Sequence, residues 1–264
     1  MLETHAKLNL ENFLDELAQS RKAALLLDYD GTLAPFRVDR HRAFPYPGVP
    51  ALLQEIINTG HTRVVLITGR PAQDIVPLLG LEPHPEIWGA YGLQRLRLDG
   101  TCEMPPMDEN VVQALAAAAQ WLNEVGFSNL VELKPGSVAV HWRGLEDSVA
   151  TRIRGTVRLG WLPIADRARM TLQEFEGGVE IKMSGTNKGD AVREFLAELD
   201  SAIPVAYLGD DLADEDAFRV LQNRGLRILV RPEWRETGAD VWLRPPEELV
   251  NFLFQWLAVC RGVR

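Results

Sequence analysis

A short apolar run that ends in two aspartates constrains the fold of this chain most strongly. Residues 23–27 are Ala-Ala-Leu-Leu-Leu, and Asp28 and Asp30 follow them closely. The run is too short for a helix, so we expect a buried parallel strand whose carboxyl end presents both carboxylates, where ligands of open parallel sheets bind. Because the carboxylates repel each other, a divalent cation, most simply Mg²⁺, and a proton are expected to neutralise them. The alternative is a helix-capping aspartate beside a turn aspartate.

Polar residues also follow two later apolar runs. Residues 63–67 lead into Thr-Gly-Arg at 68–70, and residues 204–208 lead into an acidic block at 209–216. Between these runs, Thr-Asn-Lys-Gly-Asp at 186–190 opens a helical stretch. Each block alone is weak evidence for a site. Together the blocks place carboxylates, a hydroxyl, an Arg and a Lys near one edge of a sheet, which indicates a single site.

The order of the expected elements predicts an α/β fold with a doubly wound parallel sheet. Apolar strands alternate with helical stretches over residues 23–92, the pattern changes near residue 93, and it resumes at Lys188. A chain of 264 residues is long enough for a core plus an inserted domain. We therefore expect a core of residues 1–92 and 184–264, interrupted by an α+β insertion at residues 93–183.

The insertion is expected to form a sheet with a polar face. Ser137, His141 and Arg143 share one face of a predicted strand whose other face is apolar, and Glu180 and Lys182 likewise share a face. The polar face is either solvated or turned toward a ligand. The other expected elements are a hairpin at 93–104 around Asp99-Gly100, a helix at 110–125, a helix at 146–158 and a second hairpin around residues 176–178.

Composition limits the partners and the compartment. The net charge of −9 argues against broad nucleic-acid binding but allows a small phosphorylated substrate. Cys102 and Cys260 lie far apart without metal-type spacing, which suggests a reducing compartment. The N-terminus lacks a signal-peptide pattern, and the apolar segment 251–260 is too short to span a bilayer and predicts a core helix instead. We therefore expect a cytoplasmic monomer that binds neither nucleic acid nor membrane.

The polar blocks and their order resemble the haloacid dehalogenase superfamily, and more narrowly its trehalose-6-phosphate phosphatases. The resemblance extends from about residue 20 to the C-terminus. It implies a Rossmann-like core and a cap domain whose polar face closes over a sugar. The segments that carry it are Asp-Tyr-Asp-Gly-Thr at 28–32, Thr-Gly-Arg at 68–70, Val-Glu-Leu-Lys-Pro-Gly-Ser-Val-Ala-Val-His-Trp-Arg at 131–143, Glu-Ile-Lys-Met-Ser-Gly-Thr-Asn-Lys-Gly at 180–189 and Gly-Asp-Asp-Leu-Ala-Asp-Glu-Asp-Ala-Phe at 209–218.

The resemblance implies a role for each residue of the core. Asp28 would be the nucleophile that forms an aspartyl-phosphate, and Asp30 the acid that protonates the leaving oxygen and then activates water. Thr68 would donate its hydroxyl to the phosphate, and Lys188 would offset negative charge. Arg70 is interpreted from its position as a structural cap or a core-edge ion pair and is left out of the catalytic set. The expected Mg²⁺ ligands are the Asp28 carboxylate, the Asp30 carbonyl and Asp210, with Asp211 and Asp214 as supporting or outer ligands.

The expected substrate contacts lie on two glycine-containing loops and on the cap. Gly31 would let the backbone approach the phosphate. Lys134 and His141 are the strongest cap candidates, although a single His in a strand is usually a hydrogen-bonded core residue. Glu215 and Asp216 are explained by a helix N-terminus that favours negative charge. The full expected set is Gly31, Gly69, Lys134, Ser137, His141, Arg143, Glu180 and Lys182.

The sequence departs from the family pattern near the expected sugar site. Where the family has Gly-x-His-Gly-x-Glu, this chain has Tyr91 and Gln94 in place of the His and the Glu. The phosphoryl-transfer residues are complete, so phosphate hydrolysis is the firmer expectation. The sugar phosphate is expected to be trehalose 6-phosphate, with a glucosylglycerol-type or aminocyclitol-type phosphate as the alternative.

Two other functions fit part of the pattern. A phosphomutase could use the same scaffold, and only its products would distinguish it from a phosphatase. A phosphorylatable receiver module also carries acidic residues and a Lys at strand ends, but receivers run to ~120 uninterrupted residues. They also carry adjacent aspartates early, whereas this chain has Asp-x-Asp early, an insertion and a late acidic block.

Overall fold

The computed structural model describes residues 2–175 and 177–262, and its contacts divide the chain into two units. The larger unit comprises residues 1–103 and 187–264, and the smaller unit comprises residues 104–186. The predicted boundaries at 93 and 183 differ from these. The predicted hairpin at 93–104 does form, but its strands are hydrogen-bonded into the sheet of the larger unit.

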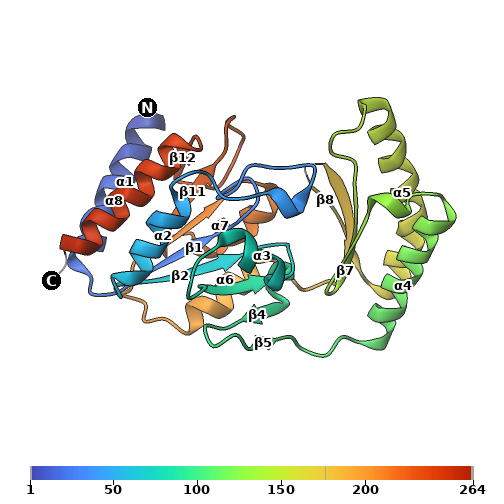
Figure 1. The fold of residues 1–264 in the computed structure, drawn as a ribbon, viewed down its shortest axis with the longest axis horizontal. Coiled ribbons are helices and arrows are strands. Elements are labelled where there is room, and N and C mark those ends of the chain that lie inside the picture. Colours follow the sequence, from blue (N-terminus) through green and yellow to red (C-terminus); the bar gives the residue numbers. More distant parts are fainter. Residues whose placement is uncertain (1, 176, 263–264) are drawn as a thin grey trace. The chain divides into compact units, whose positions relative to one another are not determined.

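The larger unit is built on an eight-stranded sheet with the order β12-β11-β10-β1-β2-β3-β4-β5 (Figure 1). The strands from β12 to β3 are parallel, and β4 and β5 are added antiparallel at one edge. The predicted doubly wound parallel sheet is therefore confirmed. The strands are β1 (Ala23–Leu27), β2 (Thr62–Ile67), β3 (Glu86–Gly89), β4 (Gln94–Leu96), β5 (Cys102–Glu103), β10 (Val205–Gly209), β11 (Leu226–Val230) and β12 (Val241–Leu243).

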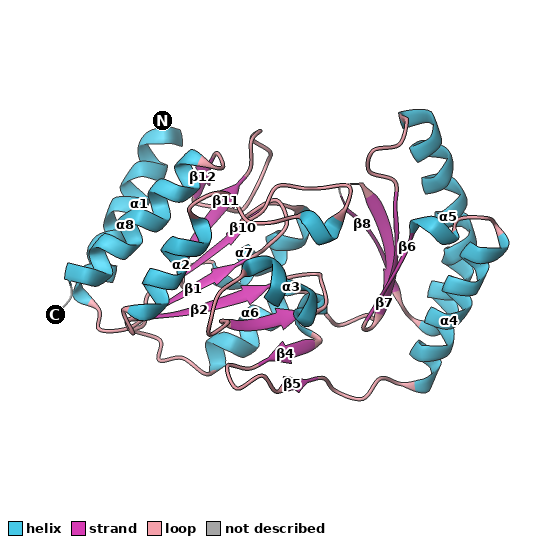
Figure 2. Ribbon diagram, in the orientation of Figure 1, coloured by secondary structure: helices cyan, strands magenta, loops and turns pink. Residues whose placement is uncertain are grey.

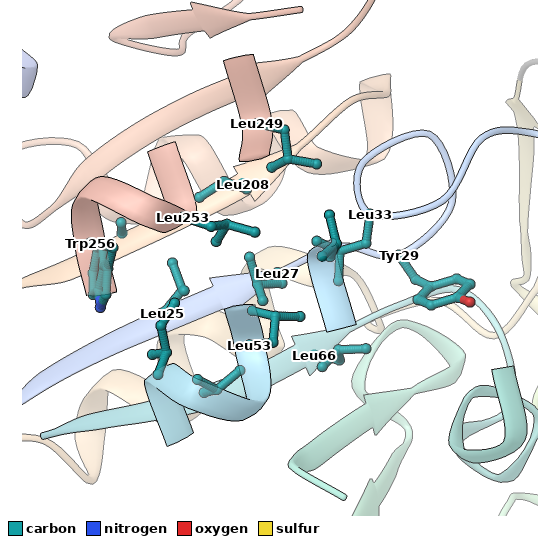
Figure 3. Packing of buried hydrophobic residues seen from close by; sticks show 14 of the residues in the cluster. Leu25, Leu27, Tyr29, Leu33, Leu53, Leu66, Leu208, Leu249, Leu253 and Trp256 are labelled. Atoms are coloured by element: carbon teal, nitrogen blue, oxygen red, sulfur yellow. The ribbon is translucent and has the colours of Figure 1, made fainter. Parts of the chain in front are cut away.

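Helices cover both faces of this sheet because successive β1 side chains point to opposite sides. Leu25 and Leu27 pack in one cluster with residues of α2 and α8, including Leu253 and Trp256 (Figure 3). Leu26 packs in a second cluster with residues of α6 and α7. The helices are α1 (Leu2–Gln19), α2 (Val49–Asn58), α3 (Ala72–Leu79), α6 (Lys188–Ala197), α7 (Glu215–Leu221) and α8 (Glu247–Gly262).

Helix α8 confirms the core helix expected over residues 251–260, since Leu253 and Trp256 are fully buried. Cys102 and Cys260 are both free thiols. Among the residues that the structure describes, no helix combines the length and the apolar character needed to cross a membrane.

The smaller unit contains a four-stranded antiparallel sheet with helices packed on its apolar face (Figure 2). Helix α4 ends one residue from its predicted end. Helix α5 runs past the predicted end at 158, because Trp161 and Ala165 continue the buried stripe of Ile153 and Val157. Glu176 lies outside the described residues, and the strands on either side of it pair antiparallel, as expected for a hairpin. The elements are β6 (Val131–Lys134), β7 (Ser137–His141), β8 (Thr171–Phe175), β9 (Gly178–Lys182), α4 (Glu109–Glu124) and α5 (Asp147–Ala168).

Candidate active site

Three neighbouring strands place the candidate residues of the core at one edge of the larger sheet. Asp28 follows β1, Thr68 follows β2 and Asp210 follows β10, and these strands lie side by side in the order β10-β1-β2. Lys188 is the first residue of α6, which Asn187 caps by accepting a hydrogen bond from the Asp190 N–H. The topology therefore gathers residues that are up to 182 positions apart in sequence, from 28 to 210.

Buried carboxylates form the centre of this site. Asp28, Asp210 and Asp214 are all buried, and each contributes an oxygen to a group whose members lie within 4.8 Å of one another. Burial, together with the charge of Asp214 and against the opposing effect of Lys188, raises the pKa of Asp28 to about 7. Burial and the nearby Asp28 charge also raise the pKa of Asp210 well above its ordinary value. The group therefore carries more negative charge than its protein surroundings favour.

Lys188 partly offsets this charge. Its Nζ lies 2.7 Å from Oδ1 of Asp28 and 2.7 Å from Oδ1 of Asp214, and the side chain is buried. Burial alone would lower the pKa of Lys188, but the charges of Asp214 and Asp28 raise it above its ordinary value. One ammonium group does not neutralise three buried carboxylates, so the site keeps a net negative charge that a further cation would compensate.

Asp214 is saturated with protein hydrogen bonds. Its Oδ1 accepts from Lys188 Nζ and from the Tyr207 hydroxyl at 2.6 Å. Its Oδ2 accepts from the backbone N–H groups of Asp210 at 3.0 Å and Asp211 at 2.9 Å. Asp211 forms a reciprocal capping box with Asp214 and does not join the buried group. This geometry suits Asp214 to holding the loop in shape rather than to direct contact with a metal.

Asp210, in contrast, is open to a metal ion. Among the described residues, none donates a hydrogen bond to its carboxylate, which is buried. A Cβ built on Gly31 would lie 2.1 Å from Oδ2 of Asp210, and Gly31 has a φ of +81°. Gly31 is therefore required for the approach of this carboxylate, whereas the sequence suggested only an approach to phosphate. Buried carboxylate oxygens with free lone pairs are a donor set that fits a hard cation such as Mg²⁺.

Asp30 makes a bidentate ion pair. Its Oδ2 accepts from Arg70 Nε at 2.6 Å and its Oδ1 accepts from Arg70 Nη2 at 2.5 Å. The sequence suggested either a structural cap or a core-edge ion pair for Arg70 and gave no partner. The structure shows that the partner is a candidate catalytic residue. The signal in the sequence was the position of Arg70 directly after a strand end, beside Thr68.

The loop after β2 is in contact with Tyr91. Thr68 is buried, and its Oγ1 accepts from the Arg70 N–H at 3.2 Å. A Cβ on Gly69 would lie 2.8 Å from Cζ of Tyr91, so the absence of a side chain makes room for this ring. Tyr91 and Ala90 have φ values of 58° and 49°, a conformation that costs energy in residues with a Cβ. The structure thus holds Tyr91 in a strained turn against the Thr68 loop.

Gln94 has a structural role. It is buried, and its Oε1 accepts from the Ala72 N–H at 3.1 Å at the beginning of α3. The side-chain oxygen of Gln94 thus satisfies a backbone group, and its replacement of a sugar-contacting Glu stays a prediction. Tyr91 is the departure that bears on the site.

In the smaller unit, several predicted substrate contacts form one buried cluster. Glu180 is fully buried, and its Oε1 accepts from the Ser137 hydroxyl at 2.5 Å and lies 2.7 Å from Lys134 Nζ. Lys182 is also buried and its Nζ donates to the Thr186 carbonyl at 3.1 Å. A solvated face is therefore excluded for these residues.

His141, another predicted cap contact, pairs with Glu132. The Nε2 of His141 lies 2.6 Å from Oε2 of Glu132, a residue that the sequence analysis did not single out. The ring centroid of His141 lies 5.3 Å from the ring centroid of Phe175. Arg143 lies against Gly177. Glu132 lies two residues before Lys134 on β6, and this alternation was the only signal for it.

Comparison with known proteins agrees with these features. Residues 26–239 match the family model described as Trehalose-phosphatase. Trehalose-phosphate phosphatase B of Arabidopsis thaliana is 27% identical over 92% of this chain and 69% of its own length. Trehalose-phosphate phosphatase of Mycobacterium ulcerans is 30% identical over 88% of this chain and 60% of its own length.

Solved structures agree in fold. The C-terminal domain of C. albicans trehalose-6-phosphate phosphatase superposes with a TM-score of 0.79 at 19% identity, over 95% of this chain and 97% of that one. A haloacid dehalogenase-like hydrolase from B. subtilis gives a TM-score of 0.61 at 14% identity, over 88% of this chain and 99% of that one. At these identities the similarity establishes the fold.

Proposed function

The chain belongs to the trehalose-phosphatase family, and we propose that it hydrolyses trehalose 6-phosphate to trehalose and inorganic phosphate with the help of Mg²⁺. The observation that carries this proposal is the pair of buried carboxylates, Asp28 and Asp210, at the carboxyl ends of adjacent strands, with Lys188 Nζ 2.7 Å from Oδ1 of Asp28. We also propose that the protein acts as a cytoplasmic monomer.

Asp28 is the proposed nucleophile. Its carboxylate attacks phosphorus in line with the leaving sugar oxygen and forms an aspartyl-phosphate, which water then hydrolyses. Lys188 contacts Asp28 Oδ1, so it orients the nucleophile and favours its ionised form. A Mg²⁺ ion held by Asp28, Asp210 and the Asp30 carbonyl would offset charge on the phosphate oxygens. Asp211 and Asp214 support the loop that carries Asp210.

Asp30 and Thr68 complete the proposed core machinery. Asp30 gives a proton to the leaving oxygen and then takes one from the attacking water. The hydroxyl of Thr68 donates to a phosphate oxygen. Gly31 and Gly69 have no side chains, so the backbone on either side can approach the phosphate closely.

The smaller unit is proposed to act as the cap domain that selects the sugar. A cluster of Lys134, Ser137 and Glu180 offers charged and hydroxyl groups that suit sugar hydroxyls, and it is supported by its burial on a rigid sheet. His141, Arg143 and Lys182 belong to the same proposed set.

A panel of phosphate esters tests the proposed function. The panel contains trehalose 6-phosphate, glucose 6-phosphate, a glucosylglycerol phosphate and p-nitrophenyl phosphate, and phosphate release is measured with Mg²⁺. We expect the highest kcat/KM on trehalose 6-phosphate. A higher value on another glycosyl phosphate would reassign the substrate and point to Tyr91. Interconversion of sugar phosphates without phosphate release would indicate a mutase.

Removing Lys134 should separate sugar recognition from chemistry. We expect Lys134→Ala to lower kcat/KM on trehalose 6-phosphate on the order of 100-fold, because sugar contacts help to position phosphorus. The loss on p-nitrophenyl phosphate should be small, since that ester has no sugar to bind. Arg154→Ala is the control in the same unit, because Arg154 forms an exposed ion pair with Glu174. Equal losses of Lys134→Ala on both esters would mean that Lys134 serves folding or the phosphate itself.

A further inference from the structure

The ion pair between Asp30 and Arg70 has a geometry that fixes the Asp30 carboxylate in place. Two parallel N–H groups of Arg70 donate to the two oxygens of Asp30, at 2.6 and 2.5 Å. The Arg70 side chain is 10% exposed and the Asp30 side chain 26% exposed. Bidentate pairs of this kind restrict both position and orientation, which a single hydrogen bond does not.

Arg70 is itself held from several sides. Its Nη1 donates to the Arg40 carbonyl at 2.7 Å, and its guanidinium carbon lies 5.7 Å from the centroid of the Tyr29 ring. Its backbone carbonyl accepts from the Ala90 N–H at 2.8 Å. Arg70 therefore links the loop after β1 to the loop after β2, and both loops carry proposed catalytic residues.

The contacts of Arg70 argue against a direct role on phosphate. Nε, Nη1 and Nη2 each donate to a protein oxygen, so every nitrogen of the guanidinium group is already engaged. An arginine whose purpose is to bind phosphate would present two of these nitrogens to the ligand. The effect of Arg70 on catalysis would therefore pass through Asp30.

We propose that Arg70 is the positioning residue for Asp30, an inference that rests on the proposed phosphatase function. As Asp28 bonds to phosphorus, the bond between phosphorus and the sugar oxygen breaks and its electron pair stays on that oxygen. The O–H bond of protonated Asp30 then breaks, and the proton joins the sugar oxygen. The Asp30 carboxylate that forms is negatively charged, and the Arg70 guanidinium stabilises it through the two hydrogen bonds. Water later attacks phosphorus and gives a proton to Asp30, while the bond between phosphorus and the Asp28 oxygen breaks and its electron pair returns to the Asp28 carboxylate, which releases inorganic phosphate.

The dependence of rate on the leaving group tests this role. A sugar alkoxide needs a proton to leave, whereas p-nitrophenolate is stable without one. We expect Arg70→Ala to lower kcat/KM on trehalose 6-phosphate, or on the sugar phosphate that the panel selects, on the order of 100-fold. The loss on p-nitrophenyl phosphate should stay below about tenfold, since general acid catalysis contributes little to that ester. Arg70→Lys keeps one charged donor and should fall between the wild type and Arg70→Ala.

Arg227 provides a matched control. It forms a bidentate pair with Asp240, with Nε and Nη2 donating at 2.9 and 2.6 Å, and the side chains are 18% and 20% exposed. Arg227→Ala should leave the ratio of the two kcat/KM values unchanged. Activity on p-nitrophenyl phosphate reports whether each variant is folded.

A double-mutant cycle with Asp30→Asn identifies the route of the effect. If Arg70 acts through Asp30, adding Arg70→Ala to Asp30→Asn should cause little further loss on the sugar phosphate. Equal losses of Arg70→Ala on both esters, or a full additional loss in the Asp30→Asn background, would overturn the inference. An enzyme that releases no phosphate from any sugar phosphate would instead refute the proposed function, and a wild-type rate for Asp30→Asn would refute the role of Asp30.

Discussion

Replacing Asp28 with asparagine should abolish turnover while the protein stays folded. The amide is nearly isosteric with the carboxylate but is not a nucleophile, so we expect phosphate release to fall by at least about 1,000-fold. The fold should persist because Lys188 keeps its second partner, Asp214. Phosphate release from sugar phosphates with saturating Mg²⁺ measures this effect. Asp216→Asn is the matched control, since Asp216 lies in the same acidic block and forms an exposed ion pair with Arg219.

Near-wild-type release by Asp28→Asn would contradict the mechanism.

A second test of Asp28 measures stability in the absence of metal. The folded pKa of Asp28 is about 7, above its ordinary value of 3.8, so the folded state binds this proton more tightly than the unfolded state. The stability that this group contributes is therefore fully present below pH 4 and is lost as the pH rises toward 7. In chelator, the Tm of Asp28→Asn relative to wild type should rise over this interval and stay constant above it.

Removing the metal should abolish activity, and Mg²⁺ should restore it. The carboxylate of Asp210 has a raised pKa and accepts no hydrogen bond from the described residues, so its charge needs a cation for compensation. We expect activity to vanish in a chelator and to return with excess Mg²⁺. Asp210→Ala should remain inactive at all Mg²⁺ concentrations. Full activity of the wild type in chelator would contradict the metal assignment.

Stability provides a test of the metal that does not depend on turnover. A ligand that binds only the folded state at about 100 times its Kd stabilises that state by about 2.7 kcal/mol. Mg²⁺ should therefore raise the Tm of the wild type in thermal melts, and it should not raise that of Asp210→Ala. Asp211→Ala is the matched control, because Asp211 caps a turn and lies outside the buried group. It should keep most of the Mg²⁺ response.

The core of the fold could be predicted because its signals are local. The apolar run before Asp28 and the runs before Thr68 and Asp210 each became a buried parallel strand. Residues at the carboxyl ends of adjacent parallel strands must meet at one edge. Knowing that the runs are strands was therefore enough to bring the carboxylates together. Lys188 joined them because Asn187, a good helix cap, directly precedes it.

The features that the sequence missed depend on contacts between distant segments. The hairpin of β4 and β5 was predicted correctly, but the sheet that it joins was not. Its place in the larger sheet comes from the pairing of β4 with β3, which no local pattern reveals. The pair of Asp30 and Arg70 joins residues 40 positions apart. The need for glycine at position 31 arises from Asp210, which lies far along the chain. Local patterns predicted elements and edges, whereas partners required the three-dimensional fold.

The aspartyl-phosphate on Asp28 is the central claim, and chemical trapping tests it most directly. The enzyme is quenched during turnover of trehalose 6-phosphate with Mg²⁺ and then treated with borohydride, which reduces an acyl phosphate to an alcohol. Peptide mass spectrometry should find homoserine in place of Asp28, only when substrate is present, and no such change at Asp30 or Asp210. Unmodified Asp28 in an enzyme quenched while it is releasing phosphate, or homoserine at another position, would contradict the account.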